Sequence, residues 1–433
     1  MTSTLRRAGG FAAVGSLALA APALGPAAAA PFVAIALLAA FVVSDGPLFE
    51  LFARPGDHED GRLNGLAGFA LAATGLALLA TVPRMTMPVT TFVAAVFVVA
   101  YGNLGASLVG AGEEEPFRRT AAFATAGFLA AFVGQAAVAW PAPQYPELAF
   151  LAASGALVAA LFRSLLFGRD DPLVMLSVGI LLWLLGVLVG DVPPLEVAAA
   201  LSLTILLGYI SYALGAASLP GMLTGVFLVL LSIVLGGVGW FAALITFFGV
   251  GALSTKFGYE RKRSQGVAED NEGARGTGNV LGNAAVALVA LVGFAATPHL
   301  AVDATPFVYA FAGSLATALA DTLSSEIGGL FEEPRLVTTF EPVRPGTDGA
   351  ITWQGELAGG IGAALVALVA VALLPVEGVV GGVVVAVGGV AGMTADSFLG
   401  ATLEGNRLGN QGVNFVATLV GALVSAALAL LVL

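Results

Sequence analysis

The sequence predicts an all-α fold, a polytopic bundle of transmembrane helices, from three observations. The chain has 433 residues and is 58% hydrophobic but only 10% charged, whereas an ordinary soluble domain is about 25% charged. Its apolar residues gather in long runs, and a run of about 20 residues crosses a hydrocarbon core as one helix. Its basic residues lie between those runs on a regular pattern. The composition excludes a soluble globular enzyme and a nucleic-acid binder.

The apolar runs predict about 15 spans, because a helix satisfies its own backbone hydrogen bonds in lipid. In chain order the expected spans are residues 11–29, 31–52, 63–82, 88–111, 119–140, 147–167, 171–190, 195–217, 219–236, 238–256, 278–296, 304–330, 353–374, 377–403 and 412–433. The first run, which follows Arg6 and Arg7 and ends in Ala27–Ala30, also resembles a secretory signal. We favour a retained first helix, because the remaining runs already direct the chain to a membrane.

The positions of the basic residues predict the orientation of these spans. With the N-terminus in the cytoplasm, every Lys and Arg faces the cytoplasm except Arg84, as the positive-inside rule requires. A single span that was wrongly merged or split would invert all later loops and destroy this agreement. The sequence therefore predicts a multi-pass protein of the cell membrane with a cytoplasmic N-terminus.

The charge balance and the missing cysteines narrow the chemistry. The 28 acidic residues outnumber the 17 basic ones, the net charge is −11, and there is no Cys. A disulfide framework, an iron–sulfur cluster and a thiol nucleophile are excluded. Acidic, lysine-poor loops are typical of a halophilic source, where carboxylates keep exposed surfaces hydrated.

Two membrane domains are expected, residues 1–190 and residues 195–433, divided at Pro193 and Pro194. They differ in where ionisable residues lie. The second half places Asp321, Glu326 and Asp396 within or at the ends of apolar runs. Because a charge at membrane depth is costly, such residues are candidates for a functional site. The chemistry is therefore expected in the second half.

The first acidic motif runs from Gly313 to Glu326. At 3.6 residues per turn, Ser314, Asp321 and Ser325 share one helical face, and Glu326 lies close to it. Hydroxyls and carboxylates together suit a hard cation such as Mg²⁺. Hydrogen bonding between helices would explain the hydroxyls, but it would not explain two carboxylates.

Two loops on the same predicted side carry basic and turn-forming residues. Lys256 and Arg263 belong to a basic loop that is either an ordinary cytoplasmic anchor or a phosphate site. The loop Arg335–Gly349 ends with Arg344, Thr347 and Asp348 among glycines, which permit a turn whose amides could hold a phosphate. Asp348 is a further candidate metal ligand, although the same stretch is also a common turn signal.

The third acidic motif centres on Asp396, an isolated carboxylate in an apolar run. Two pairs of asparagines with one-turn spacing accompany it, and they could share a ligand or pack helices: Asn279 with Asn283, and Asn410 with Asn414. Carboxylates for a divalent metal, cations for phosphate and a membrane-embedded body together favour phosphoryl or nucleotidyl transfer to a lipid. The sequence contains neither a Walker motif nor the protein-kinase motifs.

Residues 195–433 resemble the transmembrane protein 19-like family (domain of unknown function 92), which also covers the plant phytyl-phosphate kinase. The resemblance is carried by five stretches in order: Ser254–Tyr259, Asn279–Asn283, Ala320–Glu326, Pro345–Gly349 and Asp396–Leu403. One mild departure is Gly282, where the family usually has Ala. The resemblance implies a membrane-embedded isoprenoid-phosphate kinase.

The first half looks more distantly like phosphatidate cytidylyltransferases and dolichol kinases. The similar stretches are Ser44–Gly46, Phe49–Asp57 and Gly102–Gly110. Those enzymes usually carry an acidic metal ligand where this chain has Asn103. An amide is a poor ligand for Mg²⁺, so this half is interpreted as a degenerate copy.

The sequence thus favours a kinase of isoprenoid or polyprenyl phosphates, or a related CTP-dependent lipid phosphotransferase. Its expected cofactors are Mg²⁺ or another divalent cation, with CTP or ATP as the co-substrate and a membrane lipid phosphate as the acceptor. Asp321, Glu326 and Asp396 are the expected catalytic and metal-binding residues. The expected phosphate- or substrate-binding residues are Lys256, Arg263, Asn279, Asn283, Arg344, Thr347, Asp348, Asn410 and Asn414. The alternative is a transporter or lipid-moving protein that uses the same carboxylates for ion coupling.

Overall fold

The computed structural model describes residues 3–83, 86–110, 116–166, 170–265, 276–405 and 407–433. Arg84, Arg169 and Arg275, which contribute to the predicted orientation, lie outside these ranges. The chain forms two compact units, residues 1–201 and residues 202–433. The division falls within helix α11 (Pro194–Ala213), which begins at Pro194, a first helical position that accommodates proline well.

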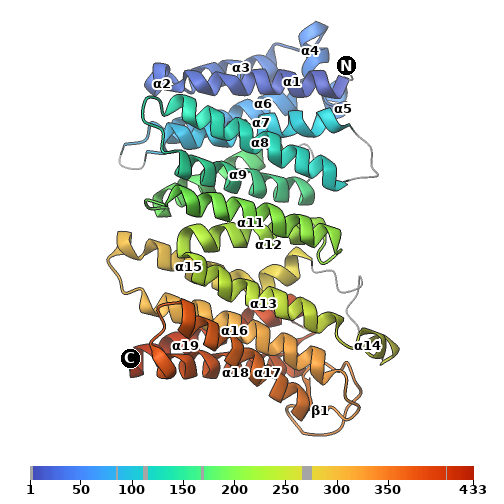
Figure 1. Cartoon of the computed structure of the whole chain (residues 1–433). Coiled ribbons are helices and arrows are strands. Elements are labelled where there is room, and N and C mark those ends of the chain that lie inside the picture. Colours follow the sequence, from blue (N-terminus) through green and yellow to red (C-terminus); the bar gives the residue numbers. More distant parts are fainter. Residues whose placement is uncertain (1–2, 84–85, 111–115, 167–169, 266–275, 406) are drawn as a thin grey trace. The chain divides into compact units, whose positions relative to one another are not determined.

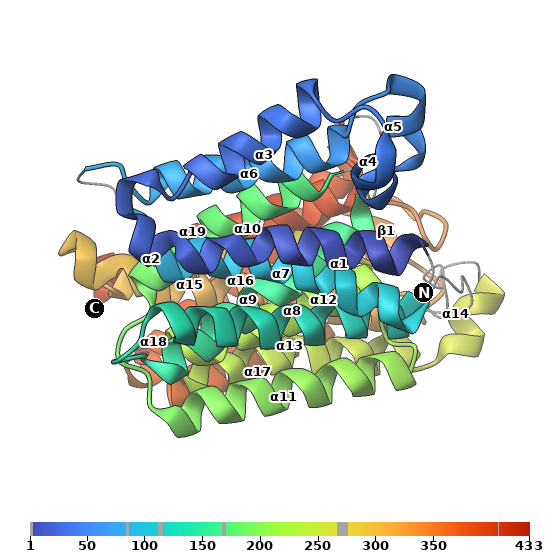
Figure 2. The same cartoon turned by 90° about the horizontal axis from the view of Figure 1, so that it is seen from above.

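Unit 1 is built from helices of unequal length (Figure 1). They are α1 (Ser3–Gly15), α2 (Ala21–Leu24), α3 (Ala30–Phe41), α4 (Gly46–Phe52), α5 (Pro55–Asp60), α6 (Asn64–Leu79), α7 (Val89–Val109), α8 (Pro116–Val138), α9 (Tyr145–Leu165) and α10 (Asp171–Leu188), with short 3-10 turns at Ser16–Ala20 and Gly25–Ala27. Helix α7 is buried along most of its length and packs against α1, α8 and α10. The path of α1 along α7 is visible from above in Figure 2.

Unit 2 contains the elements that carry the acidic motifs. They are α12 (Leu219–Leu231), a π-helical turn (Ser232–Gly236), α13 (Val238–Lys256), α14 (Tyr259–Gln265), α15 (Thr277–Leu300), α16 (Thr305–Gly328), β1 (Arg335–Leu336), β2 (Ala350–Ile351), α17 (Trp353–Leu373), α18 (Gly378–Leu403) and α19 (Asn410–Val432). The strands β1 and β2 pair antiparallel and close the loop between α16 and α17. Helix α16 is central, since α13, α15, α17, α18 and α19 all contact it.

Small residues allow α16, α18 and α19 to approach closely. A Cβ added at Gly388 or Gly421 would collide with side chains or carbonyls of the neighbouring helices. Thr317 lies in this seam and donates its hydroxyl to the carbonyl of Gly313, 3.0 Å away. Such packing is typical of helices in membranes, where burial of apolar surface supplies little attraction between helices. It holds the ends of the three helices at fixed positions.

The predicted all-α polytopic bundle is confirmed, and the number of spans is lower than expected. Thirteen helices in the described part of the chain are long and apolar enough to cross a membrane. The expected span 31–52 is instead a pair of helices bent by 104°, with Gly46 at a φ of +80° at the break. The expected span 63–82 is the 16-residue helix α6, about 24 Å long and short for the hydrocarbon core. Because these two segments are consecutive, leaving out both keeps the predicted orientation of all later spans.

Candidate functional site

A polar cavity of about 380 Å³ lies at one end of the helices of unit 2. Helices α16 and α18 end beside it, and α15 and α19 begin beside it. The lining also includes Lys262 of α14 and the loop that leads from α16 to α17. Because neighbouring helices alternate in direction, motifs that are more than 100 residues apart in the sequence meet at this one end.

Asp321 and Asp396 form the centre of this cavity. Each lies seven residues before the last residue of its helix, so both are at the same depth, about 10 Å from the helix ends. Their carboxyl groups are within hydrogen-bonding reach of each other. The Oδ1 atom of Asp396 is buried without a hydrogen-bond partner among the described residues. Two facing carboxyl groups must share a proton or bind a cation between them, because two bare negative charges repel strongly at this distance.

Lys262 and Glu326 form a buried ion pair at the edge of the same cavity. The Nζ of Lys262 contacts the carboxylate of Glu326, and the side chains are 3% and 10% exposed. The same Nζ donates to the carbonyl oxygens of Ser254 and Thr255, at 3.1 and 2.8 Å. These carbonyls belong to the last turn of α13, and the carbonyl of Ser254 also accepts from the backbone N–H of Phe257 at 3.1 Å. Lys262 therefore ties the ends of α13 and α16 together.

A glycine makes this arrangement of α13 and α14 possible. Gly258, between the two helices, has a φ of +64°, which is the left-handed region. A Cβ at this position would lie 2.7 Å from Leu330. The turn therefore brings α14 back over the end of α16, and Lys262 into the cavity.

The loop that ends in Gly349 packs directly on α18 beside Asp396. Gly349 has a φ of +73°, and a Cβ there would lie 2.5 Å from the Cβ of Ala401. The hydroxyl of Thr347 donates to the carbonyl of Arg344 at 2.8 Å and stabilises the turn. Thr347 and Asp348 are exposed and line the cavity. The loop therefore forms the wall that faces away from the membrane-spanning helices.

The two asparagine pairs meet because their helices cross at small residues. Gly278 and Gly282 of α15 lie against Gln411 of α19, which would crowd a Cβ at either position. Asn279 and Asn283 at the start of α15, and Asn410 and Asn414 at the start of α19, all line the cavity. Asn283 donates its side-chain amide to the carbonyl of Asn279 at 3.0 Å. The four amides therefore form a polar part of the cavity wall.

Glu404, which follows the last residue of α18, adds another acidic group to the lining. Partial burial raises the pKa of its carboxyl group, and the negative charge of Asp348 raises it further. A hydrogen bond with the Asn410 side chain acts in the opposite direction and lowers this pKa. Glu404 thus links the loop wall with the start of α19.

The structure gathers nine of the twelve predicted site residues into this cavity: Asn279, Asn283, Asp321, Glu326, Thr347, Asp348, Asp396, Asn410 and Asn414. The other three, Lys256, Arg263 and Arg344, are exposed and do not line it. Lys256 is the last residue of α13, Arg263 lies on α14, and Arg344 lies in the loop between β1 and β2.

The predicted set of three metal ligands is not assembled. Glu326 pairs with Lys262 instead of facing Asp321 and Asp396. Within the described ranges, no group of three or more His, Asp or Glu side chains is placed to hold a metal. The facing aspartates, with one unpartnered buried oxygen, still fit a cation such as Mg²⁺, which takes one or two protein carboxylates and completes its shell with substrate phosphates and water.

Sequence reasoning missed Lys262, Glu404 and Thr322 as lining residues. Thr322 follows Asp321 on the buried side of α16 and donates its hydroxyl to the carbonyl of Ala318 at 2.8 Å. Lys262 carried one usable signal, since it is one of only two lysines in the chain. Its spacing does not distinguish it from Arg261 and Arg263, which are exposed.

Comparisons with known proteins point to the same unit. A family model described as "Integral membrane protein DUF92" matches residues 202–422. An uncharacterised membrane protein of Methanocaldococcus jannaschii is 38% identical over 195 residues, which are 43% of this chain and 75% of that protein. One of Synechocystis is 32% identical over 204 residues, 45% of this chain and 76% of that protein. Protein VTE6, chloroplastic, of Arabidopsis thaliana is 32% identical over 200 residues, 44% of this chain and 58% of that protein. No solved structure matches the chain.

Proposed function

This chain belongs to the DUF92 family of integral membrane proteins, and from that premise we propose that unit 2 is a kinase of prenyl-type lipid phosphates. The observation that carries the proposal is the facing pair Asp321 and Asp396 in a polar cavity that also holds Lys262. The resemblance of the acidic motifs to those of an isoprenoid-phosphate kinase family supports the same reaction. We place the protein in the cell membrane.

The proposed reaction moves the terminal phosphoryl group of a nucleoside triphosphate to a lipid monophosphate. An oxygen of the monophosphate attacks the terminal phosphorus, a new P–O bond forms, and the bond to the bridging oxygen breaks to release the nucleoside diphosphate. When the monophosphate is fully ionised, no proton needs to leave the attacking oxygen. Catalysis then consists mostly of positioning and of neutralising negative charge.

The cavity residues have two proposed roles. Some would neutralise the negative charge of the phosphates, and others would orient the substrates. A divalent cation bound by Asp321 and Asp396 would neutralise phosphate charge. Lys262 presents a cation at the rim, already held in place by Glu326 and two carbonyls. The amides of Asn279, Asn283, Asn410 and Asn414 would donate to phosphate oxygens. Gly346 and Gly349, both with positive φ, shape the turn that holds Thr347 and Asp348 in the cavity wall.

The depth of the aspartates favours an enzyme over the alternative, a transporter or lipid-moving protein. Asp321 and Asp396 lie toward the ends of α16 and α18, beside the basic segment that contributes Lys262. A transporter site is expected near the middle of the membrane, at the interface of structural repeats. The cavity instead sits at the level where a lipid headgroup and a soluble nucleotide can meet.

The deciding experiment is a transfer assay on the purified chain in nanodiscs. The mixture contains Mg²⁺, CTP or ATP, and phytyl or geranylgeranyl monophosphate, and the diphosphate product is measured by mass spectrometry. We expect product with the wild-type chain and a loss of about a hundredfold or more with Asp396→Asn, the size typical of removing one group that stabilises developing charge.

The matched control is Asp303→Asn, which makes the same change of carboxylate to amide before the opposite end of α16. Asp303→Asn should keep wild-type turnover. Absence of product with every nucleotide and lipid phosphate, or equal turnover by Asp396→Asn and wild type, would contradict the kinase proposal. Coupled proton or ion movement in sealed vesicles that depends on Asp396 would then favour the transporter.

A further inference from the structure

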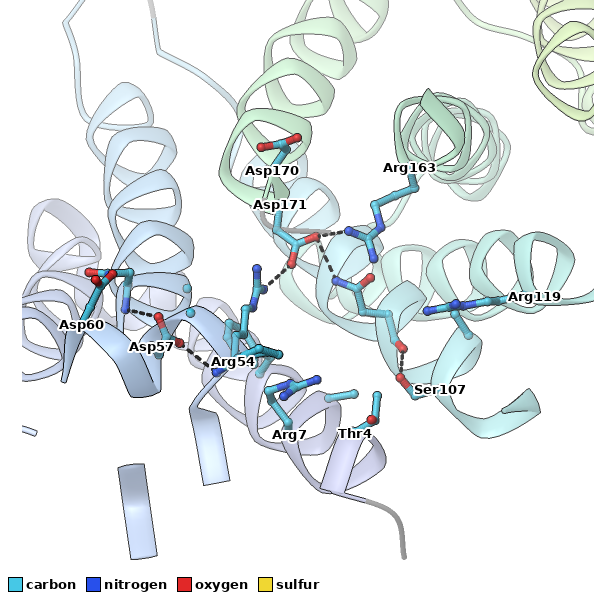
Figure 3. Close-up of a pocket in the computed structure, with 18 residues that line it drawn as sticks. Thr4, Arg7, Arg54, Asp57, Asp60, Ser107, Arg119, Arg163, Asp170 and Asp171 are labelled. Carbon is cyan, nitrogen blue, oxygen red and sulfur yellow. Dashed lines mark hydrogen bonds and ion pairs between the residues drawn. The ribbon is translucent and has the colours of Figure 1, made fainter. Parts of the chain in front are cut away.

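Unit 1 contains a second polar cavity, which nothing in the proposed function uses. It has a volume of about 870 Å³ and lies where α1, α6, α8 and α10 begin and α7 and α9 end. Four arginines line it: Arg7, Arg54, Arg119 and Arg163. Figure 3 shows them surrounding one space, with Arg7, Arg119 and Arg163 coming from three helices and Arg54 from the turn before α5. We call it the arginine pocket.

A buried aspartate holds two of these arginines in place. Asp171 is 3% exposed and accepts from the Nη2 of Arg54 at 2.7 Å and from the Nη1 of Arg163 at 3.0 Å. The amide of Asn103 donates to the same carboxylate at 3.2 Å. The guanidinium of Arg54 also lies over the ring of Phe11, 5.3 Å from its centre. Both guanidinium groups are therefore fixed before any ligand arrives, which lowers the entropic cost of binding.

The backbone is shaped to leave room for Arg54. A Cβ at Gly65 would lie 2.7 Å from the Nε of Arg54, so only glycine lets this side chain pass over the start of α6. Asp57 accepts from the backbone amides of Arg54 and Asn64, both at 2.9 Å, and fixes the turn. The position of Arg54 is thus determined by packing and hydrogen bonds on several sides.

Four arginines and four aspartates line the cavity, so their formal charges balance, and the arginines are distinguished by how their donors are used. Asp171 is shared by two guanidinium groups, and Asp57 accepts from two backbone amides. Arg7 donates to a neutral acceptor, the carbonyl of Ala53, at 2.9 Å. Arg119 makes no hydrogen bond or ion pair with any part of the chain that the structure describes, and Figure 3 shows it directed toward the pocket. Arg7 and Arg119 therefore supply the donors that a ligand in the pocket can use.

We propose that the arginine pocket binds the phosphate group of a phosphorylated ligand. Planar guanidinium groups recognise phosphate oxygens with paired hydrogen bonds, and several of them directed from different helices match a group with several charged oxygens better than a carboxylate. Four helices begin at the pocket (α1, α6, α8 and α10) and two end there (α7 and α9), so the helix ends add net partial positive charge. Either a lipid headgroup or a soluble phosphate compound can supply this group.

The test measures binding to the full chain in dodecyl maltoside, which carries no phosphate. Pyrophosphate, followed by titration calorimetry, represents a soluble ligand. Phosphatidic acid, added to the micelles and followed by native mass spectrometry, represents a lipid headgroup. Hydrogen–deuterium exchange should show protection of the segment 53–65 and of the start of α8 by whichever probe binds.

The pocket variant is Arg7→Gln with Arg119→Gln, and the control is Arg6→Gln with Arg118→Gln. The control removes the same charge from the neighbouring positions of the same helices, which do not line the cavity. We expect the pocket variant to bind about tenfold or more weakly and the control to bind like wild type. The single variant Arg119→Gln, at an exposed position, should weaken binding even if the double variant folds poorly.

Binding of pyrophosphate alone would identify a soluble ligand, and binding of phosphatidic acid alone would identify a headgroup. Three results would overturn the proposal: no binding of either probe, equal weakening in the pocket and control variants, or wild-type affinity in all variants. The last result would place the bound phosphate in unit 2.

Discussion

Lys262 and Lys256 are the two lysines of the chain, and the structure gives them different roles. Lys256 is exposed at the end of α13, whereas Lys262 is buried and contacts Glu326 and two helix-end carbonyls. A buried ion pair contributes little net stability, because removing both charges from water is costly. Removing one partner of an existing buried pair is nevertheless costly, because the remaining charge stays buried without a counter-charge.

We predict that Lys262→Met lowers the free energy of unfolding by about 3–5 kcal/mol, because Glu326 and the last carbonyls of α13 lose their cation. Thermal unfolding in detergent measures this change. Lys256→Met is the control and should shift the unfolding midpoint little. The double variant Lys262→Met with Glu326→Gln should recover part of the loss. Equal midpoints for the two lysine variants would contradict the structural role of Lys262.

The elements of the site are fixed by turns as much as by helices. Gly349 sits at a φ of +73° with its Cα directly against α18. Gly405, just after α18, has a similar φ of +74° but open space around it. Comparing substitutions at the two glycines therefore distinguishes the effect of backbone strain from the effect of lost contact with α18.

We predict that Gly349→Ala lowers activity in the transfer assay, because a methyl group would push the loop off α18 and move Thr347 and Asp348 away from the aspartate pair. Its stability cost should also exceed that of Gly405→Ala, which introduces only the strain of a left-handed residue, about 1 kcal/mol. Comparing turnover and unfolding midpoints of the two variants measures both effects. Similar losses in both would show that contact with α18 is unimportant.

The start of α16 predicts a dependence of stability on pH. The backbone N–H of Thr305 donates to the carboxylate of Asp303 at 2.9 Å and holds the pKa of that carboxyl below its ordinary value of 3.8. The folded state therefore binds fewer protons than the unfolded state near this pH. The ionised Asp303 carboxylate therefore stabilises the folded state above pH 3.8. This stabilisation is lost as the pH falls through the lower pKa of the folded state.

We predict that Asp303→Asn unfolds at a lower temperature than wild type at neutral pH, and that this difference shrinks as the pH falls below 3.8. A series of thermal unfolding curves in detergent from neutral to acidic pH measures the two midpoints. A difference that stays constant across the series would show that the Asp303 carboxylate contributes no pH-dependent stability.

The whole molecule divides into two units that each contain one polar cavity. The family match, residues 202–422, covers unit 2 and none of unit 1. We predict that a fragment of residues 194–433, which keeps α11 complete, inserts into membranes, elutes as a single species and transfers phosphate like the full chain. Size-exclusion chromatography and the transfer assay measure this. A folded fragment without activity, beside an active full chain, would show that unit 1 takes part in the reaction.

The segment around Asp45 shows that the length of an apolar run is not sufficient to predict a membrane span. An unbroken apolar count predicts one span over 31–52, but Gly46 and Pro47 start a new helix after a sharp bend. The later spans were predictable because each is a long apolar run with a polar end. Asp321 and Asp396 could be singled out because a carboxylate in such a run is rare and costly, and both line the cavity of unit 2.

The sequence by itself determined the class of fold, the helices of unit 2 and nine of the 24 residues that line its cavity, since transfer of apolar and charged groups between water and lipid depends on local composition. Only the tertiary structure decided which charges meet. It placed Lys262 rather than Lys256 on Glu326, and it gathered four arginines around Asp171. These pairings depend on how close two helix ends approach, and that distance is set by glycines and side-chain packing far away along the chain.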